Sequence, residues 1–432
     1  VHDLPLTLNS KLDVARLPLP AAAARGRRPS GPVEEAVCAA FAQVLGLETV
    51  GAEDDFFALG GHSLLAMRVV TVLGQRLGRR VGVAALLAAP TPAGLVASLG
   101  ADHDPFAVVL PLGARREAGR GGAGRPGSAP VAPVAPVAPV LCVHPMLGLG
   151  WTFSSLAARL RATQADAPAV YALQSPALRD PAGLADCPDL SVLAARLADE
   201  AEIACAADGD DLRRTGCRLV GWSFGGHVAH AMAAAFQDRG VAVHGLLLLD
   251  PGPPAGRRPV DDEPDRLPDS PADPGAVADQ QEVLAFLLAA GLREAPPELG
   301  PPYDPAETLD FLTEGTGAFS ALGADDLATL TRVFTANRRL LATARSRPIA
   351  APTTLVVATG SGAGDATEST RAASTQEAVA AWATLTTGGL RRVDLDVPHD
   401  LLTAPFAAER LAPLLTDTDP EHPAAPIAQE TR

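Results

Sequence analysis

The sequence predicts two folded parts, a small all-helical domain followed by a larger α/β domain with a mostly parallel sheet and a helical lid. In the first part, apolar residues recur at helical spacing from Val33 onward. In the second part, short and continuously apolar runs alternate with helical stretches, which is typical of parallel strands covered on both faces. A segment rich in Gly, Ala and Pro separates them, and a chain of 432 residues has room for more than one core.

The helical domain is expected over residues 29–99 as a small four-helix bundle. Val37 and Phe41 continue the apolar spacing of its first helix. Ser63 is expected to begin a second helix, and Thr91, which a proline follows, is expected to begin another. A unit of about 70 residues with these starts can bury one small core.

A linker is expected over residues 100–139. Its second half repeats Val-Ala-Pro, which favours polyproline II at about 3.1 Å per residue and predicts a semi-stiff spacer. The two flanking domains could therefore move apart without separating. Residues 418–432 are polar and contain several prolines, so they are expected to form a disordered tail.

The α/β domain is expected over residues 140–417. Apolar runs predict strands within 140–145, 217–222, 245–250 and 353–360. Helices between such runs imply right-handed βαβ crossovers and hence a parallel sheet. A Pro- and Asp-rich stretch followed by helices interrupts this rhythm over about 255–347. Since it follows a strand end, where active sites form, this interval is expected to be a lid.

Composition excludes several classes of function. The formal charge of −15 argues against binding to nucleic acid, because such proteins concentrate Lys and Arg. Hydrophobic residues make up 47% of the chain, yet no apolar run approaches the roughly 20 residues of a membrane span. The cysteines lack a CxxC pair and metal-ligand spacing, so no metal site is predicted, and reduced thiols in a cytoplasm are expected; they stand at 38, 142, 187, 205 and 217.

A motif at residues 55–64, DFFALGGHSL, marks a site of covalent modification. Gly60 and Gly61 form a turn poor in side chains, and the dipole of the helix that Ser63 begins can favour a phosphodiester. A bare helix cap is the plainer interpretation of such a serine. The motif resembles the DxFFxxGGxSL pattern of peptidyl carrier proteins at every specified position. That resemblance implies that a phosphopantetheinyl transferase attaches 4′-phosphopantetheine to Ser63, and that the arm carries a growing peptide as a thioester. Polyketide-type carriers usually have Asp before the serine, where His62 stands, so the peptide-synthetase type is favoured.

Residues 1–20 contain LPLTLNSKLD, which resembles the last core motif of adenylation domains. Ser10 and Val14 depart from that motif, where Gly and Arg are usual, whereas Lys11 matches its lysine. The resemblance implies that this segment is the C-terminal remnant of an adenylation domain, and it predicts upstream adenylation and condensation domains of one synthetase as partners. The start at Val1 predicts a fragment of a longer enzyme.

Ser223 lies in the sequence GWSFGG, a GxSxG nucleophile elbow. The apolar run 217–221 precedes it and a helical stretch that ends at Gly240 follows it, which is the strand-turn-helix context that such an elbow requires. Small residues around the serine allow the sharp turn. The pattern predicts an α/β-hydrolase fold with Ser223 as the nucleophile.

The general base and its acid should follow the nucleophile in the order Ser, acid, His. Beyond Asp250 the chain has two histidines, His399 after an apolar strand and His422 in the polar tail, and His399 is therefore expected to be the base. Asp250 ends the run GLLLLD. Its position resembles that of the acid in the thioesterases that terminate peptide and polyketide synthases. Other hydrolases place the acid one strand later, where Asp365 stands, and both remain candidates with Asp250 favoured.

The developing oxyanion needs two backbone donors. The amide of Phe224, directly after the nucleophile, is expected to be one. The second is assigned to Met146, because residues 144–151, HPMLGLGW, resemble the HPxxG-like segment of thioesterases. His144 precedes a proline and is expected to be a structural loop residue rather than a second base.

Together these resemblances imply the termination module of a non-ribosomal peptide synthetase, with a type I serine thioesterase that releases a carrier-bound peptide by hydrolysis or macrocyclisation. Two alternatives remain open. One is a generic esterase for free small esters, and the other is a carrier fused to an inactive docking hydrolase.

Overall fold

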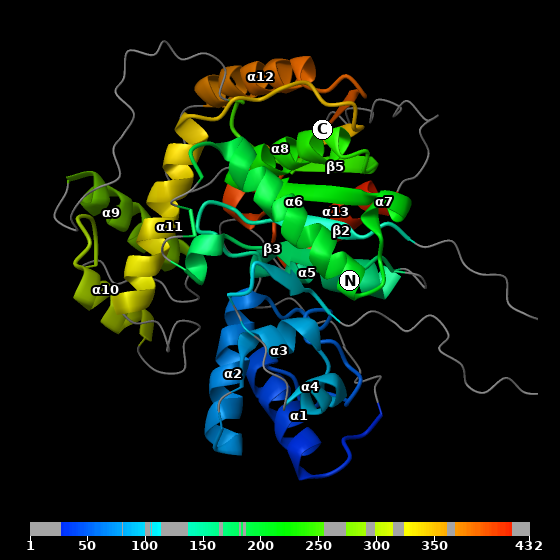
Figure 1. The fold of residues 1–432 in the computed structure, drawn as a ribbon. Coiled ribbons are helices and arrows are strands. Elements are labelled where there is room, and N and C mark those ends of the chain that lie inside the picture. The colour runs from blue at the N-terminus through cyan, green and yellow to red at the C-terminus, as the bar shows by residue number, and fades with distance from the viewer. Residues whose placement is uncertain are drawn as a thin grey trace, which may run out of the picture.

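The structure is a computed structural model that describes residues 27–79, 81–99, 104, 106–113, 137–163, 167–180, 183–184, 187–254, 274–290, 299–313, 324–360 and 368–416. The expected adenylation remnant at 1–20, the tail at 418–432 and the alternative acid Asp365 lie outside these residues. Within them, a helical domain stands beside an α/β domain (Figure 1).

The helical domain contains α1 (Pro32–Leu45), α2 (Ser63–Leu77), α3 (Val83–Ala88) and α4 (Pro92–Ser98). Its core is apolar and includes Phe41, Phe56 and Leu73, which are completely buried. The rings of Phe41 and Phe56 meet edge to face with centroids 5.1 Å apart. Helix α2 begins at Ser63 as predicted, and the Thr91 side chain accepts a hydrogen bond from the Gly94 amide at the start of α4.

The α/β domain is built on a seven-stranded sheet in the order β1-β3-β2-β4-β5-β6-β7. The strands are β1 (Val109–Pro111), β2 (Val140–Val143), β3 (Val170–Leu173), β4 (Cys217–Trp222), β5 (Val243–Leu249), β6 (Thr353–Ala358) and β7 (Leu390–Leu395). All pairs are parallel except β1 with β3. The mostly parallel sheet predicted from the apolar runs is therefore confirmed, and its carboxyl ends share one edge.

Strand β1 corrects the expected linker. Residues 109–111 pair with β3, and the Leu112 amide donates to the Val170 carbonyl at 2.8 Å, so this part of 100–139 belongs to the sheet. The run Val109–Pro111 is too short to be recognised as a strand by its own pattern, and it is ordered by its pairing with β3.

Alternation along the strands divides the core between the two faces of the sheet. In β2, Leu141 and Val143 contribute to one cluster, and Val140 and Cys142 to the other. Figure 1 shows helices on both sides of the sheet. The first cluster contains residues of α6 (Leu190–Ala207), α8 (Phe224–Asp238) and α12 (Glu368–Thr384), and the second contains residues of α5 (Ser154–Thr163) and α13 (Pro405–Thr416).

Among the described residues of the interval where a lid was expected, the structure has three helices. They are α9 (Pro274–Ala290), α10 (Pro305–Thr313) and α11 (Ala324–Ala342). Figure 1 shows α11 running alongside the α/β body, with α9 and α10 on its outer side. On α11, Leu330, Val333 and Leu340 are buried in the first core cluster, so this helix is anchored to the body.

The helical domain contacts the α/β domain through an ion pair and an apolar cluster. The Arg161 guanidinium on α5 lies 2.8 Å from the Asp55 carboxylate and also donates to the Leu112 carbonyl. Both side chains of the pair are less than a fifth exposed. The second core cluster continues from Leu110 and Leu112 into the helical domain. Arg161 therefore joins the helical domain to the segment that follows it.

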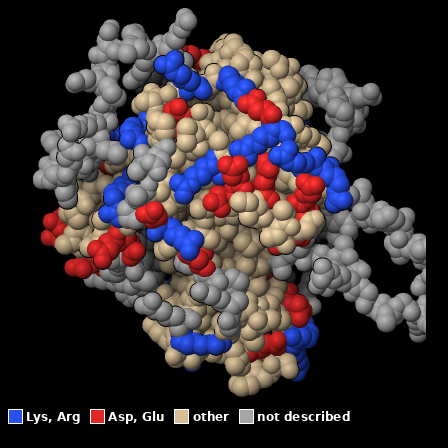
Figure 2. Space-filling view, in the orientation of Figure 1, with Lys and Arg blue, Asp and Glu red and all other residues tan. Residues whose placement is uncertain are grey.

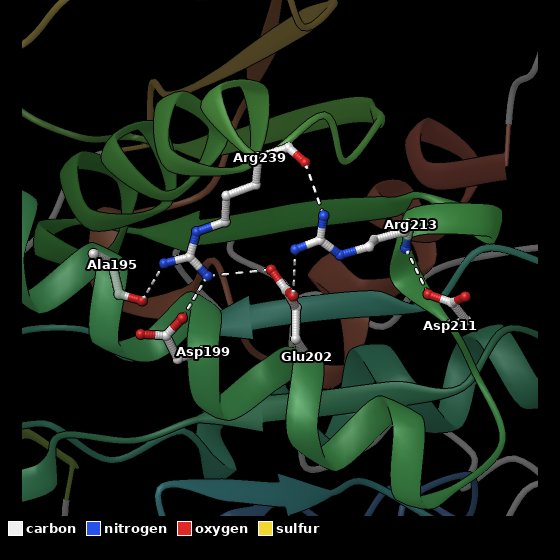
Figure 3. A network of polar contacts seen from close by, with 6 residues as sticks. All are labelled: Ala195, Asp199, Glu202, Asp211, Arg213 and Arg239. Carbon is white, nitrogen blue, oxygen red and sulfur yellow. Dashed lines mark hydrogen bonds and ion pairs between the residues drawn. The ribbon is translucent and has the colours of Figure 1, made fainter.

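Charged side chains of both signs lie next to one another on the face of the α/β domain shown in Figure 2. Figure 3 shows one such network between α6, α8 and the short helix α7 (Leu212–Thr215). Arg239 lies 2.6 Å from Asp199 and 3.1 Å from Glu202, and Glu202 also lies 3.7 Å from Arg213. These pairs connect neighbouring helices and leave the charges locally balanced.

None of the described helices combines the length and the hydropathy that a membrane span requires. The five cysteines are all buried, and none of them forms a disulfide.

Candidate active site

Ser223 sits in a strained turn between β4 and α8. Its φ is 56°, in the left-handed region that residues with a side chain rarely occupy. The Ser223 amide donates to the Leu249 carbonyl at 2.9 Å, and the serine carbonyl accepts from Gly226 at 2.9 Å. A Cβ on Gly221 would lie 2.5 Å from the carbonyl carbon of Gly225, so the turn requires glycine there. This is the elbow that the GxSxG motif predicted.

Asp250 and His399 form a direct hydrogen bond although 149 residues separate them. His399 Nδ1 lies 2.7 Å from Asp250 Oδ2, and since the carboxylate can only accept, Nδ1 carries the proton. Asp250 Oδ1 accepts from the Ala358 amide at 3.2 Å. The φ of Asp250 is 46°, a second strained residue at the carboxyl edge of the sheet. The arrangement leaves Nε2 of His399 free to take a proton.

Trp222 supports His399 from the strand before the nucleophile. Its indole Nε1 donates to the His399 carbonyl at 3.2 Å, and the two ring centroids are 5.6 Å apart. His399 begins the short 3₁₀ helix η4 (His399–Leu401), and its side chain is 45% exposed. Trp222 was not predicted as a site residue. Its signal in the sequence was a large aromatic residue inside the elbow motif.

Ser223 Oγ forms no hydrogen bond within the described part of the chain. The structure thus pairs Asp250 with His399 and places Ser223 at the end of the adjacent strand, without a formed bond between Ser223 and His399. Catalytic hydrogen bonds are often long before substrate binds, so this geometry is compatible with a resting hydrolase.

Phe224 begins α8 directly after the serine and is 1% exposed. Met146 lies in the loop after β2, and its carbonyl accepts from Nδ2 of Asn337 at 2.8 Å. Asn337 comes from α11 and is completely buried. This contact was not predicted. A signal was present, because Asn337 continues the apolar row of Leu330, Val333 and Leu340 at helical spacing, where a polar residue needs a partner.

Three buried histidines surround the elbow without taking part in the Asp250 pair. Burial lowers the pKa of His144 to about 4 and the pKa of His230 to about 4. Burial, with a smaller contribution from His230, also lowers the pKa of His227 to about 4. The rings of His227 and His230 both face Trp382, with centroids 5.3 and 5.2 Å away. These imidazoles are neutral at pH 7.

Ser63 is the first residue of α2, with His62 as the N-cap in extended conformation. The preceding turn needs its glycines. Gly60 has a φ of 98°, and a Cβ on Gly61 would lie 2.5 Å from the Phe56 carbonyl oxygen. Asp55 stabilises the same turn by accepting from the amides of Phe57 and Ala58 through Oδ1. Two glycines shortly before Ser63 leave this turn poor in side chains, which is compatible with the attachment of a long phosphodiester arm there.

Comparison with known families agrees with this geometry. Residues 138–404 match the model of the thioesterase domain, and residues 35–99 match the model of the phosphopantetheine attachment site. The chain belongs to the thioesterase family. Its thioesterase domain follows a carrier domain that is modified covalently by 4′-phosphopantetheine. No group of three or more His, Cys, Asp or Glu that could hold a metal occurs among the described residues of this thioesterase.

The relatives of this thioesterase are peptide synthetases. It is 37% identical over 255 residues to the probable non-canonical nonribosomal peptide synthetase CymA of Salinispora arenicola, covering 58% of the chain and 3% of that relative. It is 33% identical over 332 residues to a dimodular nonribosomal peptide synthase of Bacillus subtilis, covering 74% and 12%. Enterobactin synthase component F of Escherichia coli is 33% identical over 294 residues, covering 66% and 20%.

A crystal structure of a four-domain nonribosomal peptide synthetase bound to AMP and glycine aligns with 97% of the chain and 28% of its own length, at 23% identity and a TM-score of 0.49. The matched region is thus a small share of each relative. The chain holds a carrier domain and a thioesterase domain.

Proposed function

We propose that this module releases a peptidyl chain from the carrier through a Ser223, His399 and Asp250 triad. The observation that carries the proposal is the 2.7 Å hydrogen bond between His399 Nδ1 and Asp250 Oδ2 beside the strained Ser223 elbow. Asp250 rather than Asp365 is the proposed acid because of this bond. The phosphopantetheine arm, attached at Ser63, supplies the thiol that holds the peptide as a thioester.

His399 acts first as the general base. Its Nε2 takes the Ser223 proton while Oγ attacks the thioester carbonyl carbon, and the carbonyl oxygen becomes an oxyanion. The amides of Phe224 and Met146 donate to this oxyanion. His399 then gives the proton to the departing sulfur as the carbon–sulfur bond breaks. The products are a free thiol on the carrier and an ester on Ser223.

A second nucleophile ends the reaction. His399 takes a proton from water, whose oxygen attacks the Ser223 ester and yields a free acid, or from an amine or hydroxyl of the same peptide, which yields a macrocycle. His399 returns the proton to Ser223 Oγ in both cases. Asp250 keeps Nδ1 protonated and stabilises the imidazolium without taking the proton.

The carrier serves as the delivery device in this proposal. Tethering places the thioester near the thioesterase at an effective concentration on the order of millimolar, as for short flexible linkers. Upstream adenylation and condensation domains of one synthetase would load it, a phosphopantetheinyl transferase would prime it, and the compartment would be the cytoplasm. The sequence similarity to CymA and to enterobactin synthase component F supports this placement.

The test uses the holo protein loaded with a synthetic peptidyl-pantetheine on the carrier. Ser223→Ala should lower release on the order of 10⁶-fold, as for triads that act as a unit, and leave the peptide on Ser63. Intact-protein mass spectrometry follows the carrier, and the product mass separates the acid from the cycle, which is lighter by one water. Release by Ser223→Ala at the wild-type rate would contradict the proposal.

Two controls address the alternatives. Ser63→Ala should abolish release of carrier-bound peptide yet retain hydrolysis of a free thioester, whereas a generic esterase would have no carrier-dependent reaction to lose. A fluorophosphonate should label Ser223 in the wild-type protein. An unlabelled Ser223 would favour an inactive docking hydrolase.

A further inference from the structure

Two peptide planes meet at the Met146 Cα, and each is held by a buried side chain. The Pro145 carbonyl accepts from His144 Nδ1 at 2.9 Å and from the Gly148 amide at 2.9 Å. The Met146 carbonyl accepts from Asn337 Nδ2 at 2.8 Å. In a trans peptide the N–H points opposite to the C=O of the same plane. The two bonds to the Pro145 carbonyl therefore set the direction of the Met146 N–H.

The burial and the tautomer of His144 suit it to holding the Pro145 carbonyl in place. The side chain is completely buried, and since a carbonyl can only accept, Nδ1 carries the proton. Nε2 has no hydrogen-bond partner among the described residues, so the Pro145 bond is the polar contact that orients the ring. The His144 and Phe224 rings lie 5.8 Å apart. One side chain thus touches the segments that hold both expected oxyanion donors.

Asn337 reaches the same loop from the lid helix α11. It is completely buried, and its Oδ1 has no partner among the described residues. A buried side-chain amide that donates to one carbonyl while its own oxygen accepts no hydrogen bond lowers the stability of the fold. Val333, one turn earlier on α11, packs so closely that a Cβ on Gly148 would lie 2.6 Å from it. Helix α11 and the loop that holds Met146 and Gly148 are therefore coupled. A movement of α11 either carries this loop with it or breaks both contacts.

We propose that His144 and Asn337 are positioning residues that hold the Met146 amide as an oxyanion donor, with Asn337 coupling that donor to the lid helix α11. The proposal rests on the function proposed above, and it adds that a displacement of α11 releases the Met146 carbonyl and lowers transition-state stabilisation. Neither side chain exchanges a proton with the substrate.

The first test separates the hydrogen bond of His144 from its ring. His144→Asn keeps a donor near the Nδ1 position and loses the ring, whereas His144→Phe keeps a ring against Phe224 and loses the donor. The proposal expects His144→Phe to lower kcat about 10- to 100-fold with little change in KM, and His144→Asn to recover most of the loss. A role in packing alone predicts the reverse order of the two variants.

The second test removes the Asn337 donor. Asn337→Leu, which has no donor for the Met146 carbonyl, should lower kcat about 10- to 100-fold. Thr331→Ala on the same helix is the matched control, since the Thr331 hydroxyl donates to the Leu327 carbonyl of α11 itself. Titration of active sites with a fluorophosphonate, carried to completion, corrects every kcat for the folded fraction.

A spectroscopic measurement reports on the donor itself. An alkyl trifluoromethyl ketone forms a hemiketal with Ser223, and fluorine NMR gives the ionisation pKa of its hydroxyl. A well-placed Met146 amide lowers that pKa, so His144→Phe and Asn337→Leu should raise it while Thr331→Ala should not. Wild-type values of kcat and of the hemiketal pKa in both variants would overturn the inference. A wild-type protein that forms no adduct at Ser223 would instead overturn the proposed function.

Discussion

Trp222 and His399 are joined by a hydrogen bond from the indole Nε1 to the histidine carbonyl at 3.2 Å, across 177 residues of chain. Trp222, the residue before Ser223, thereby holds the loop of His399, while Asp250 bonds to the imidazole. Because both contacts start at neighbouring strand ends, the position of His399 depends on the register between β4 and β5.

Replacement of Trp222 by Phe tests this support. The ring contact with His399 would remain while the donor to its carbonyl is lost, so we expect kcat for thioester hydrolysis to fall about 10-fold, the value of one net hydrogen bond. Steady-state kinetics on a free pantetheine thioester measures it. An unchanged kcat would show that the loop of His399 is held by other contacts.

Asp250→Asn tests the acid directly. The amide would offer its N–H to Nδ1 and stabilise the wrong imidazole tautomer, so kcat should fall on the order of 10⁴-fold, as in serine hydrolases with this substitution. Asp365→Asn is the matched variant and should retain near wild-type activity. The opposite pattern, with Asp365→Asn inactive and Asp250→Asn active, would move the acid to the later strand.

Arg161→Ala tests the contact between the carrier and the thioesterase. The guanidinium bonds to the Asp55 carboxylate and to the Leu112 carbonyl, so its loss should shift the equilibrium towards an undocked carrier about 10-fold. Small-angle X-ray scattering should give a larger radius of gyration. Arg159→Ala on the same helix is the control, because Arg159 pairs at 3.9 Å with Glu409 of the thioesterase domain itself. Equal radii of gyration for the two variants would contradict the role of Arg161 in docking the carrier.

The buried histidines predict a loss of stability in mild acid. Burial lowers the pKa of His144, His227 and His230 from 6.5 to about 4, so the unfolded chain binds more protons than the folded one between these values. The contribution of these three histidines to the free energy of unfolding should be constant above pH 7, and it should fall as the pH drops from 6.5 towards 4. Urea titrations at several pH values measure the slope.

His230→Gln should reduce that slope by up to about 1.4 kcal/mol per pH unit, the contribution of one titrating proton. A slope that does not respond to His230→Gln would mean that this histidine is charged in the folded state.

The elbow, the carrier turn and the strands around the site could be predicted because their signals are local. Gly60 and Gly61 before Ser63, and the small residues around Ser223, are required by turns a few residues long. Strands β1 and β3 are three and four residues long and were not predicted, since their order comes from pairing with each other and with β2. For the same reason, the linker expected at 100–139 included residues that belong to β1.

By itself the sequence predicted the residue types and the order of the chemistry: a serine for modification shortly after two glycines, an elbow serine after an apolar strand, and a later acid and histidine. Only the tertiary structure decided that Asp250 meets His399, that Trp222 bonds to the His399 carbonyl, and that Asn337 of α11 reaches the Met146 carbonyl. Local motifs report the conformation of a few neighbouring residues, whereas these contacts join segments more than a hundred residues apart, which come together only when the sheet and its helices pack.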